Sequence, residues 1–119
     1  MAGEQRVESA IVVQKAYDLL LWLLPKVEKF PRSFRFSVGD RMVAVGLDLL
    51  LLVVEASYSA DKTELLETAN RKGNGLRYLV RLAKDMKLLT LDSYGFAAER
   101  VEEIGRMIGG WKKSVRGRT

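Results

Sequence analysis

The sequence predicts an all-α protein, folded as an antiparallel four-helix bundle with up-down-up-down topology. Its apolar residues recur at steps of three and four and never settle into strict alternation, which is the spacing of helix faces. β-Branched residues are sparse, and proline occurs only at Pro25 and Pro31. Short connections between long helical stretches favour a bundle, because short loops join antiparallel neighbours.

The first predicted helix runs from about Glu4 to Glu28. Pro25 lies inside it, and we expect a kink over residues 21–25, because proline removes a backbone donor and crowds the preceding turn. The residue before a proline avoids helical geometry. The pair Phe30-Pro31 therefore marks the end of this helix.

The segment FPRSFRFSVGD, residues 30–40, joins the first helix to the second and is rich in aromatic and cationic side chains. Ser37, with an aspartate three residues later, is a variant of the capping box and predicts a second helix from about Val38 to Ser59. Phe34 and Phe36 are expected to fold over the end of the bundle. The alternative is a stacking platform of aromatic rings and arginines for nucleic-acid bases.

A third helix is expected from about Asp61 to Lys87, and the letters DKTE at its start are a second capping-box variant. Gly73 and Gly75 lie within it. Each glycine costs about 1 kcal/mol relative to alanine in a helix, so a break near Asn74 is a second possibility beside a continuous helix.

The fourth helix is expected from about Leu91 to Trp111, with Thr90 as its N-cap. Gly105 and Gly109 are four residues apart on it, a spacing that would let another backbone approach closely. The basic tail over residues 112–119 is expected to fray.

The residue types that are missing exclude several classes of chemistry. The chain has neither cysteine nor histidine, which rules out disulfides, thiolate or imidazole metal sites and the usual general base near neutral pH. The 119 residues, 1–119, suit one globular domain. The most apolar run, residues 42–54, is shorter than the ~20 residues of a membrane span. We therefore expect a cytoplasmic protein without signal peptide, cofactor or metal, and not an enzyme.

The first two helices carry more apolar residues than a four-helix bundle needs. Asp48 is the only polar residue in residues 43–54, and Asp18 is the only charge in YDLLLWLL. A helix that is apolar all round is buried all round, so the surplus should pack against further copies of the chain. An unusually apolar monomer is the alternative. The predicted interface residues are Leu20, Trp22, Leu24, Val45, Leu49 and Leu52.

Two carboxylates of the second helix have a predicted structural role. Asp48 and Glu55 are seven residues apart and share one helix face. A buried carboxylate must be paired or protonated, so arginines of the third helix are the expected partners.

The cations of the chain are segregated, at a formal net charge of +5. Arg77, Arg81 and Lys84 are spaced by four and three residues and so line one face of the third helix. Such an array suits a nucleic-acid backbone, and a solvated face is the alternative. No base-reading motif is present, so binding should be largely insensitive to sequence. The predicted nucleic-acid or polymerase-binding residues are Arg77, Arg81, Lys84, Arg71, Lys72, Lys26 and Lys29.

Four stretches, in this order, carry a family resemblance: YDLLLWLLPKVEKFPRSFRFSVGDRM, LDLLLLVVEASYSADKTELLETAN, LRYLVRLAKDMKLL and EEIGRMIGGW. They resemble the accessory variability determinant proteins of diversity-generating retroelements. More distantly, they resemble the four-helix proteins encoded in intervening sequences of large-subunit ribosomal RNA genes. The resemblance covers residues 17–111.

The resemblance implies a homo-oligomeric ring of five subunits with a basic central channel. It also implies a partner, the reverse transcriptase that copies a template RNA into mutagenised cDNA, and no chemistry of the protein's own. Arg77 and Arg81 match the basic pattern of the family's third helix, and Lys84 follows in the same segment. The letters RKGNG depart from that pattern. A structural or protein-interaction module without nucleic-acid binding, of the intervening-sequence type, is the alternative.

Overall fold

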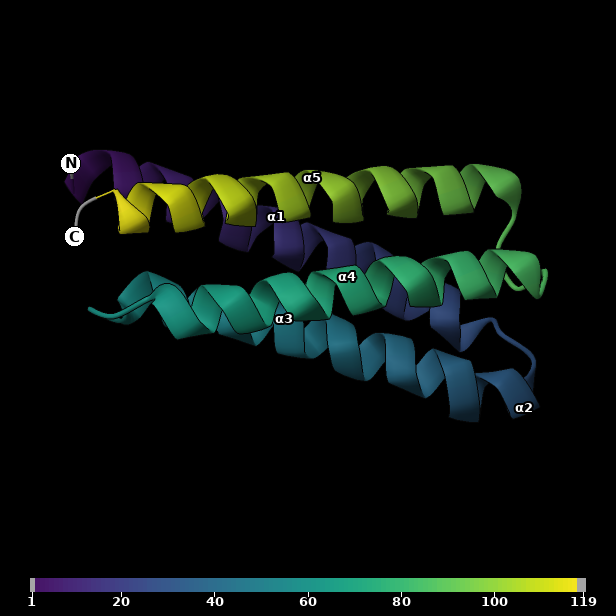
Figure 1. Ribbon diagram of the computed structural model, residues 1–119. Helices are drawn as coiled ribbons and strands as arrows, with labels where there is room; N and C mark the ends of the chain where they lie inside the picture. The colour runs from purple at the N-terminus through teal and green to yellow at the C-terminus, as the bar shows by residue number, and fades with distance from the viewer. Residues whose placement is uncertain (1, 118–119) are drawn as a thin grey trace.

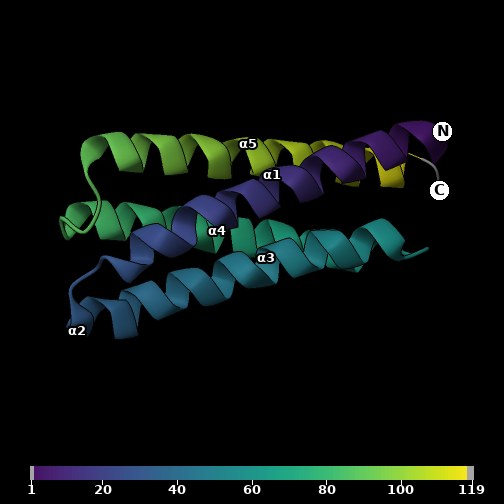
Figure 2. The same ribbon diagram turned by 180° about the vertical axis from the view of Figure 1, so that it is seen from behind.

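The computed structural model describes the backbone of residues 2–117 and the side chains of residue 7 and residues 9–117. Four long helices run antiparallel: α1 (Ala2–Glu28), α3 (Asp40–Tyr58), α4 (Thr63–Asp85) and α5 (Leu91–Arg116) (Figure 1). Both α1 and α4 pack against α3 and α5, so α1 and α4 lie on a diagonal of the bundle. Seen from behind, α1 crosses from the side of α5 toward α3 (Figure 2). The predicted four-helix bundle is confirmed.

The core lies along the axis of the bundle and is built from all four helices. Among the described side chains, none of the buried ones is polar or charged. The core is therefore held mainly by apolar burial and packing, at about 25 cal/mol per Å² of apolar surface removed from water. Its largest fully buried side chains include Leu23, Met42, Leu49, Leu66, Leu76, Ile104, Ile108 and Trp111.

The joint between α1 and α3 differs from the expectation. After Pro31 the chain re-enters helical geometry at once, through α2 (Arg32–Phe34) and the π-helical turn η1 (Arg35–Gly39). The hydroxyl of Ser37 donates to the carbonyl of Ser33, 2.9 Å away, and makes no N-cap. The predicted cap is wrong because the backbone N–H groups around Ser37 already belong to a helical ladder.

Gly39 permits the close approach of this joint to α1. A Cβ built on Gly39 would lie 2.8 Å from Cγ1 of Val27 and 3.3 Å from the carbonyl oxygen of Phe34. Valine is stiff about its first side-chain torsion and cannot move aside cheaply. The lack of a side chain at this position therefore lets the start of α3 lie against the end of α1.

The connection between α3 and α4 is short, as predicted. The ammonium of Lys62 donates to the carbonyl oxygen of Ala56, 2.7 Å away, which also accepts the N–H of Ser59 at 3.4 Å. Lys62 thereby adds a hydrogen bond at the end of α3. Asp61 accepts the N–H of Thr63 at 3.2 Å, but Lys62 occupies the N-cap position without a side-chain cap, so the predicted capping box does not form. Helix α4 then runs without a break through Gly73 and Gly75, so the break considered near Asn74 does not occur.

Helix α4 ends in a Schellman motif, and α5 begins at the predicted cap. The N–H of Leu88 donates to the carbonyl of Ala83 at 2.8 Å, and the N–H of Lys87 to that of Lys84 at 2.9 Å. Lys87 takes a left-handed backbone conformation, with φ at 63°. The hydroxyl of Thr90 accepts the N–H of Ser93 at 3.0 Å, which confirms Thr90 as the N-cap.

Replacing Lys87 by glycine is expected to raise the free energy of unfolding by about 0.5–1 kcal/mol, because glycine removes the steric penalty of the left-handed region. Chemical denaturation measures the change. Lys87→Ala is the matched control, since it removes the same charge but keeps the Cβ. Equal stability of both variants would contradict a penalty at this residue.

Helix α5 is longer than predicted. It continues past Trp111 to Arg116, so residues 112–116 do not fray. Trp111 is fully buried and anchors this last part of the helix. Residues 118–119 of the predicted tail lie outside the described residues. The helix α5 ends at the same end of the bundle at which α1 begins (Figure 1).

Within the described part of the chain, no helix combines the length and the apolar character that crossing a membrane would require.

Six of the large apolar residues exposed on the described surface form two stripes on neighbouring helices. On α1 they are Tyr17, Leu21 and Leu24, and on α3 they are Leu47, Leu51 and Tyr58. The spacings of three, four and seven residues place each set on one face of its helix. We call these two sets the α1/α3 apolar surface.

Of the six predicted interface residues, the structure leaves only one well exposed. Leu24 lies on the α1/α3 apolar surface, whereas Trp22, Val45 and Leu52 are half-buried. Leu20 and Leu49 are buried in the core of the single chain. These two are a correction, because helix periodicity turns them toward the bundle axis and leaves Leu21 and Leu51 on the outside.

Candidate nucleic-acid interface

Three of the cationic residues predicted to bind nucleic acid lie on one face of α4, and the helix is continuous over this stretch. We call Arg77, Arg81 and Lys84 the α4 basic face. Arg81 and Lys84 both approach the carboxylate of Asp85, at 4.0 and 3.4 Å. The guanidinium of Arg77 lies 5.4 Å from the ring of Tyr78 and, among the described residues, has no carboxylate partner. Arg77 therefore presents the least compensated charge of the three.

Lys84 is less available than the two arginines. Its ammonium lies 4.6 Å from the centre of the Tyr94 ring, which belongs to α5. A cation over an aromatic face is attracted by the negative face of the ring. Lys84 therefore also stabilises the packing of α4 on α5, and its side chain is only 28% exposed.

Arg71 and Lys72 are not part of this face. The ammonium of Lys72 lies 3.1 Å from the carboxylate of Asp48, and Arg71 donates to the hydroxyl of Thr68 at 3.0 Å. The predicted partner of Asp48 is thus wrong in residue type. The side chain of Asp48 is also 53% exposed, so its charge does not need an arginine to compensate for burial. Glu55 is exposed as well, and no ion pair to it is found in the described residues.

Lys26 lies in the last turn of α1 and Lys29 directly after it, diagonally across the bundle from α4. They nevertheless share an end of the molecule with Lys84, because α1 and α4 both finish where α2 and the α4–α5 connection lie (Figure 1). Lys26 sits 5.4 Å from the Trp22 ring, which in turn packs at 4.9 Å against Phe96 of α5. Folding therefore brings Lys26 and Lys29 to the same end of the bundle as Lys84 of α4.

The same end carries an exposed aromatic ring between two arginines. Phe36 is 61% exposed, so it does not fold over the bundle as expected, whereas Phe34 is half-buried. The guanidiniums of Arg32 and Arg35 lie 5.9 and 5.1 Å from the centre of the Phe36 ring. An exposed ring beside two guanidiniums is closer to the stacking platform considered for this segment than to aromatic side chains that only cover the end of the bundle.

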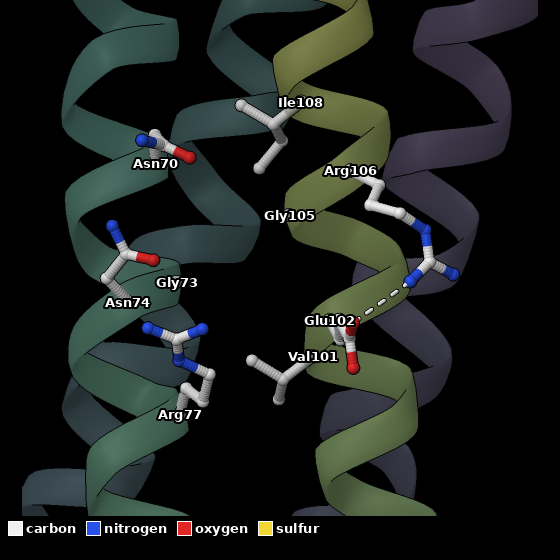
Figure 3. Close-up of a pocket in the computed structure, with 9 residues that line it drawn as sticks. All are labelled: Asn70, Gly73, Asn74, Arg77, Val101, Glu102, Gly105, Arg106 and Ile108. Atoms are coloured by element: carbon white, nitrogen blue, oxygen red, sulfur yellow. Dashed lines mark ion pairs between the residues drawn. The ribbon is translucent and has the colours of Figure 1, made fainter.

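A hollow of about 240 Å³ lies between α4 and α5, next to the α4 basic face (Figure 3). From α4 it is lined by Asn70, Gly73, Asn74 and Arg77, and Gly105 is among the residues from α5. Arg77 and Val101 face each other across it. The sequence does not predict this hollow, although the spacing of Asn70, Asn74 and Arg77 places three polar residues on one face of the helix.

Gly73 and Gly105, the two glycines that line the hollow, are not required for a close approach of helices in the single chain. A Cβ built on Gly73 or on Gly105 would meet no atom within 4 Å. The same holds for Gly109, which the sequence had suggested as a place of close backbone contact. In the single chain, Gly73 and Gly105 therefore leave open space between α4 and α5.

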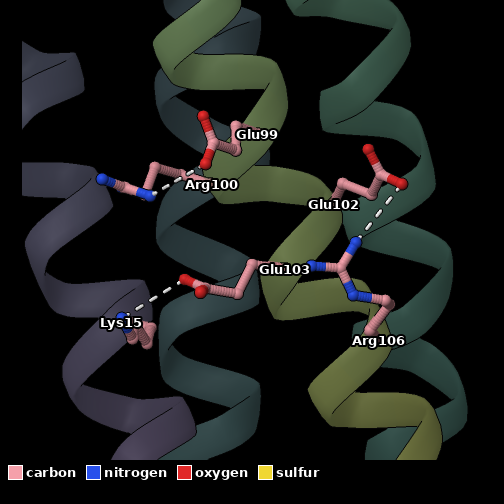
Figure 4. A network of polar contacts seen from close by, with 6 residues as sticks. All are labelled: Lys15, Glu99, Arg100, Glu102, Glu103 and Arg106. Atoms are coloured by element: carbon pink, nitrogen blue, oxygen red, sulfur yellow. Dashed lines mark ion pairs between the residues drawn. The ribbon is translucent and has the colours of Figure 1, made fainter.

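Three carboxylates of α5, those of Glu99, Glu102 and Glu103, have cationic partners (Figure 4). Glu102 pairs with Arg106 at 3.3 Å and Glu99 with Arg100 at 3.8 Å. Glu103 reaches Lys15 of α1 at 3.3 Å, which ties α1 to α5. These pairs offset the acidity of α5, so it opposes the positive field of α4 only weakly.

No metal centre can be assembled from the residues that the structure describes, because no three acidic side chains gather there. The groups that converge on α4 are guanidinium, ammonium and amide groups. Such groups bind phosphates and the polar edges of bases through hydrogen bonds and charge.

Comparisons with known proteins point to one family and one fold. The family model described as bAvd-like matches residues 10–115. A protein of unknown function from the S23 ribosomal protein family of Bacteroides thetaiotaomicron has the same fold, with a TM-score of 0.82 at 14% identity. The match covers 89% of this chain and 98% of that one. No curated protein matches the sequence. The resemblance drawn from the sequence is confirmed.

Proposed function

Because the chain belongs to the bAvd-like family, we propose that it is a non-catalytic accessory protein of a diversity-generating retroelement. In this role it binds the reverse transcriptase of the element and the backbone of RNA or DNA. It thereby supports the copying of template RNA into mutagenised cDNA. The family and the residues of α4 support this proposal together.

The observation that carries the nucleic-acid part is the α4 basic face. Arg77 lacks a carboxylate partner among the described residues, and Arg77 and Arg81 are both exposed. Cations that replace the counterions of a phosphate backbone gain affinity by releasing them. Because no base-reading motif accompanies this face, binding through it should depend on the backbone and on salt more than on sequence.

A homo-oligomer is the second part of the proposal, and a ring of five subunits is the form that the family resemblance implies. The α1/α3 apolar surface supports it, since large exposed apolar patches mark interfaces. In a closed ring each subunit contributes the same basic face, so the fields of the copies add.

Replacing Arg77 and Arg81 by alanine is expected to weaken binding to single-stranded RNA and to flatten its salt dependence. At about 0.7 per neutralised phosphate on a single strand, the slope of log affinity against log salt should fall by about 1.4 per subunit. Fluorescence anisotropy at several salt concentrations measures both quantities. Circular dichroism should show an intact fold, because both side chains are exposed.

The double variant Lys112→Ala/Lys113→Ala is the matched control, since it removes the same formal charge from the C-terminal part of α5. Affinity that survives the loss of Arg77 and Arg81 would place the contact elsewhere. A wild-type protein without affinity for RNA or DNA would favour the protein-interaction module. Co-purification with the cognate reverse transcriptase tests the partner independently of nucleic acid.

A further inference from the structure

We propose that the hollow between α4 and α5 binds one unpaired base of a nucleic-acid strand whose backbone lies on the α4 basic face. The inference rests on the proposed function and adds a second kind of contact to it. Backbone contacts through cations accept duplexes and single strands alike. A hollow that receives a base selects for a strand whose bases are free.

The lining of the hollow has the chemistry that a base edge requires. Asn70 and Asn74 lie one turn apart on α4, and their side chains follow one another toward Arg77 (Figure 3). Each carboxamide offers two donors and one acceptor oxygen, which is the mixed pattern that the polar edges of bases present. Within the described part of the chain, neither carboxamide has a hydrogen-bond partner.

The remaining wall suits the flat face of a ring. Val101 and Ile108 of α5 also line the hollow; both are buried and so form its apolar floor, and Figure 3 shows Ile108 turned toward α4. Glu102 and Arg106 also line the hollow and pair with each other at 3.3 Å, with the Arg106 side chain directed away from α4 (Figure 3). At about 240 Å³ the hollow is smaller than the ~300–1,000 Å³ of sites for drug-sized ligands, so it fits a single ring system.

Arg77 connects the hollow to the backbone contact. It lines the hollow and also belongs to the α4 basic face, beside Arg81 one turn further along the helix. A base held against the two asparagines would leave its own phosphate near Arg77. The planar guanidinium can bind that phosphate through two parallel hydrogen bonds.

The glycines explain why the space is open. Alanine would fit at Gly73 and at Gly105 and would be more favourable in a helix by about 1 kcal/mol at each position. Gly75 is an equally open position on the same helix but does not line the hollow. The three glycines therefore separate the effect of filling the hollow from the effect of stabilising the helix.

The test compares an ordinary single-stranded DNA with a strand of the same length whose bases are all absent. Wild-type protein is expected to bind the ordinary strand about tenfold more tightly, the low end of what one accommodated base contributes. Gly73→Ala/Gly105→Ala and Asn70→Ala/Asn74→Ala should each reduce this ratio toward one. Gly75→Ala should keep the wild-type ratio. Anisotropy at fixed salt measures all four proteins.

The outcomes separate this inference from the proposed function. Equal affinity of wild-type protein for both strands would overturn the base site, while the salt-dependent contact of Arg77 and Arg81 would stand. No affinity for either strand would overturn the base site, and the same result with single-stranded RNA would overturn the proposed function as well. If the glycine variant changed the mass of the oligomer and kept the wild-type ratio, the hollow would belong to a subunit contact and the inference would fail.

Discussion

Trp111→Ala is expected to lower the free energy of unfolding by about 3–5 kcal/mol, the range for truncating a large aromatic side chain in a core. Trp111 is fully buried, at the place where the sequence had predicted the end of the fourth helix. A domain of this size is stabilised by only about 5–15 kcal/mol in total, so the loss takes a large share. Urea denaturation followed by circular dichroism measures it.

Trp111→Phe is the matched control for this prediction. The indole Nε1 of Trp111 is buried and has no hydrogen-bond partner among the described residues. Phenylalanine keeps most of the apolar volume and removes that unpaired donor, so it should cost about 1.5 kcal/mol or less. If Trp111→Phe destabilised the protein as much as Trp111→Ala, the indole N–H would have a partner, such as a buried water.

Leu21→Glu combined with Leu51→Glu is expected to convert the proposed oligomer into single folded subunits. Leu21 and Leu51 are 57% and 62% exposed on the α1/α3 apolar surface, so the fold tolerates the charges. In an interface the same carboxylates would be buried without partners, which costs several kcal/mol per charge. Light scattering after size-exclusion chromatography should show the mass fall to that of one chain.

Leu91→Glu is the control, because Leu91 is 77% exposed at the start of α5, outside the α1/α3 apolar surface. It should leave the oligomer intact. A wild-type protein that stays a single subunit at high concentration would overturn the oligomer proposal. An oligomer that resists the two glutamates would place the interface on another face.

The elements of this fold whose signals are local could be read from the sequence. Thr90 caps α5 as predicted, since the cap needs only a hydroxyl and an N–H three residues later. Ser37 has an equally good local signal and still makes no cap, because the chain had already resumed a helix after Pro31. Whether a serine begins a helix therefore depends on the residues before it, which the capping pattern does not include.

The ends of helices depend on contacts that no local pattern contains. The basic letters after Trp111 predicted fraying, yet α5 runs on to Arg116, whose guanidinium lies 3.0 Å from the carboxylate of Glu67 on α4. Asp48 similarly binds Lys72 instead of an arginine. Both ion pairs depend on which turns of two neighbouring helices lie side by side. The sequence of one helix does not contain that information, because it is determined by the packing of the folded bundle.

The candidate site likewise has one part that the sequence predicts and one part that it does not. Arg77 and Arg81 could be placed on one face from their spacing, because a single continuous helix determines it. The hollow could not be found this way, since Gly73 and Gly105 belong to different helices and only their juxtaposition leaves the space. The asparagines at Asn70 and Asn74 gave a usable signal, as they continue the row that ends at Arg77.

The neighbouring positions of the first turn of α1 and the last turn of α5 matter for attaching the protein to a surface. A biosensor chip or bead coupled through either helix end would hold the bundle upright, with α2 and the α4–α5 connection pointing into solution. Lys84, Phe36 and their surroundings would then remain accessible to a captured strand. Coupling through lysine side chains would instead scatter orientations and block part of this end.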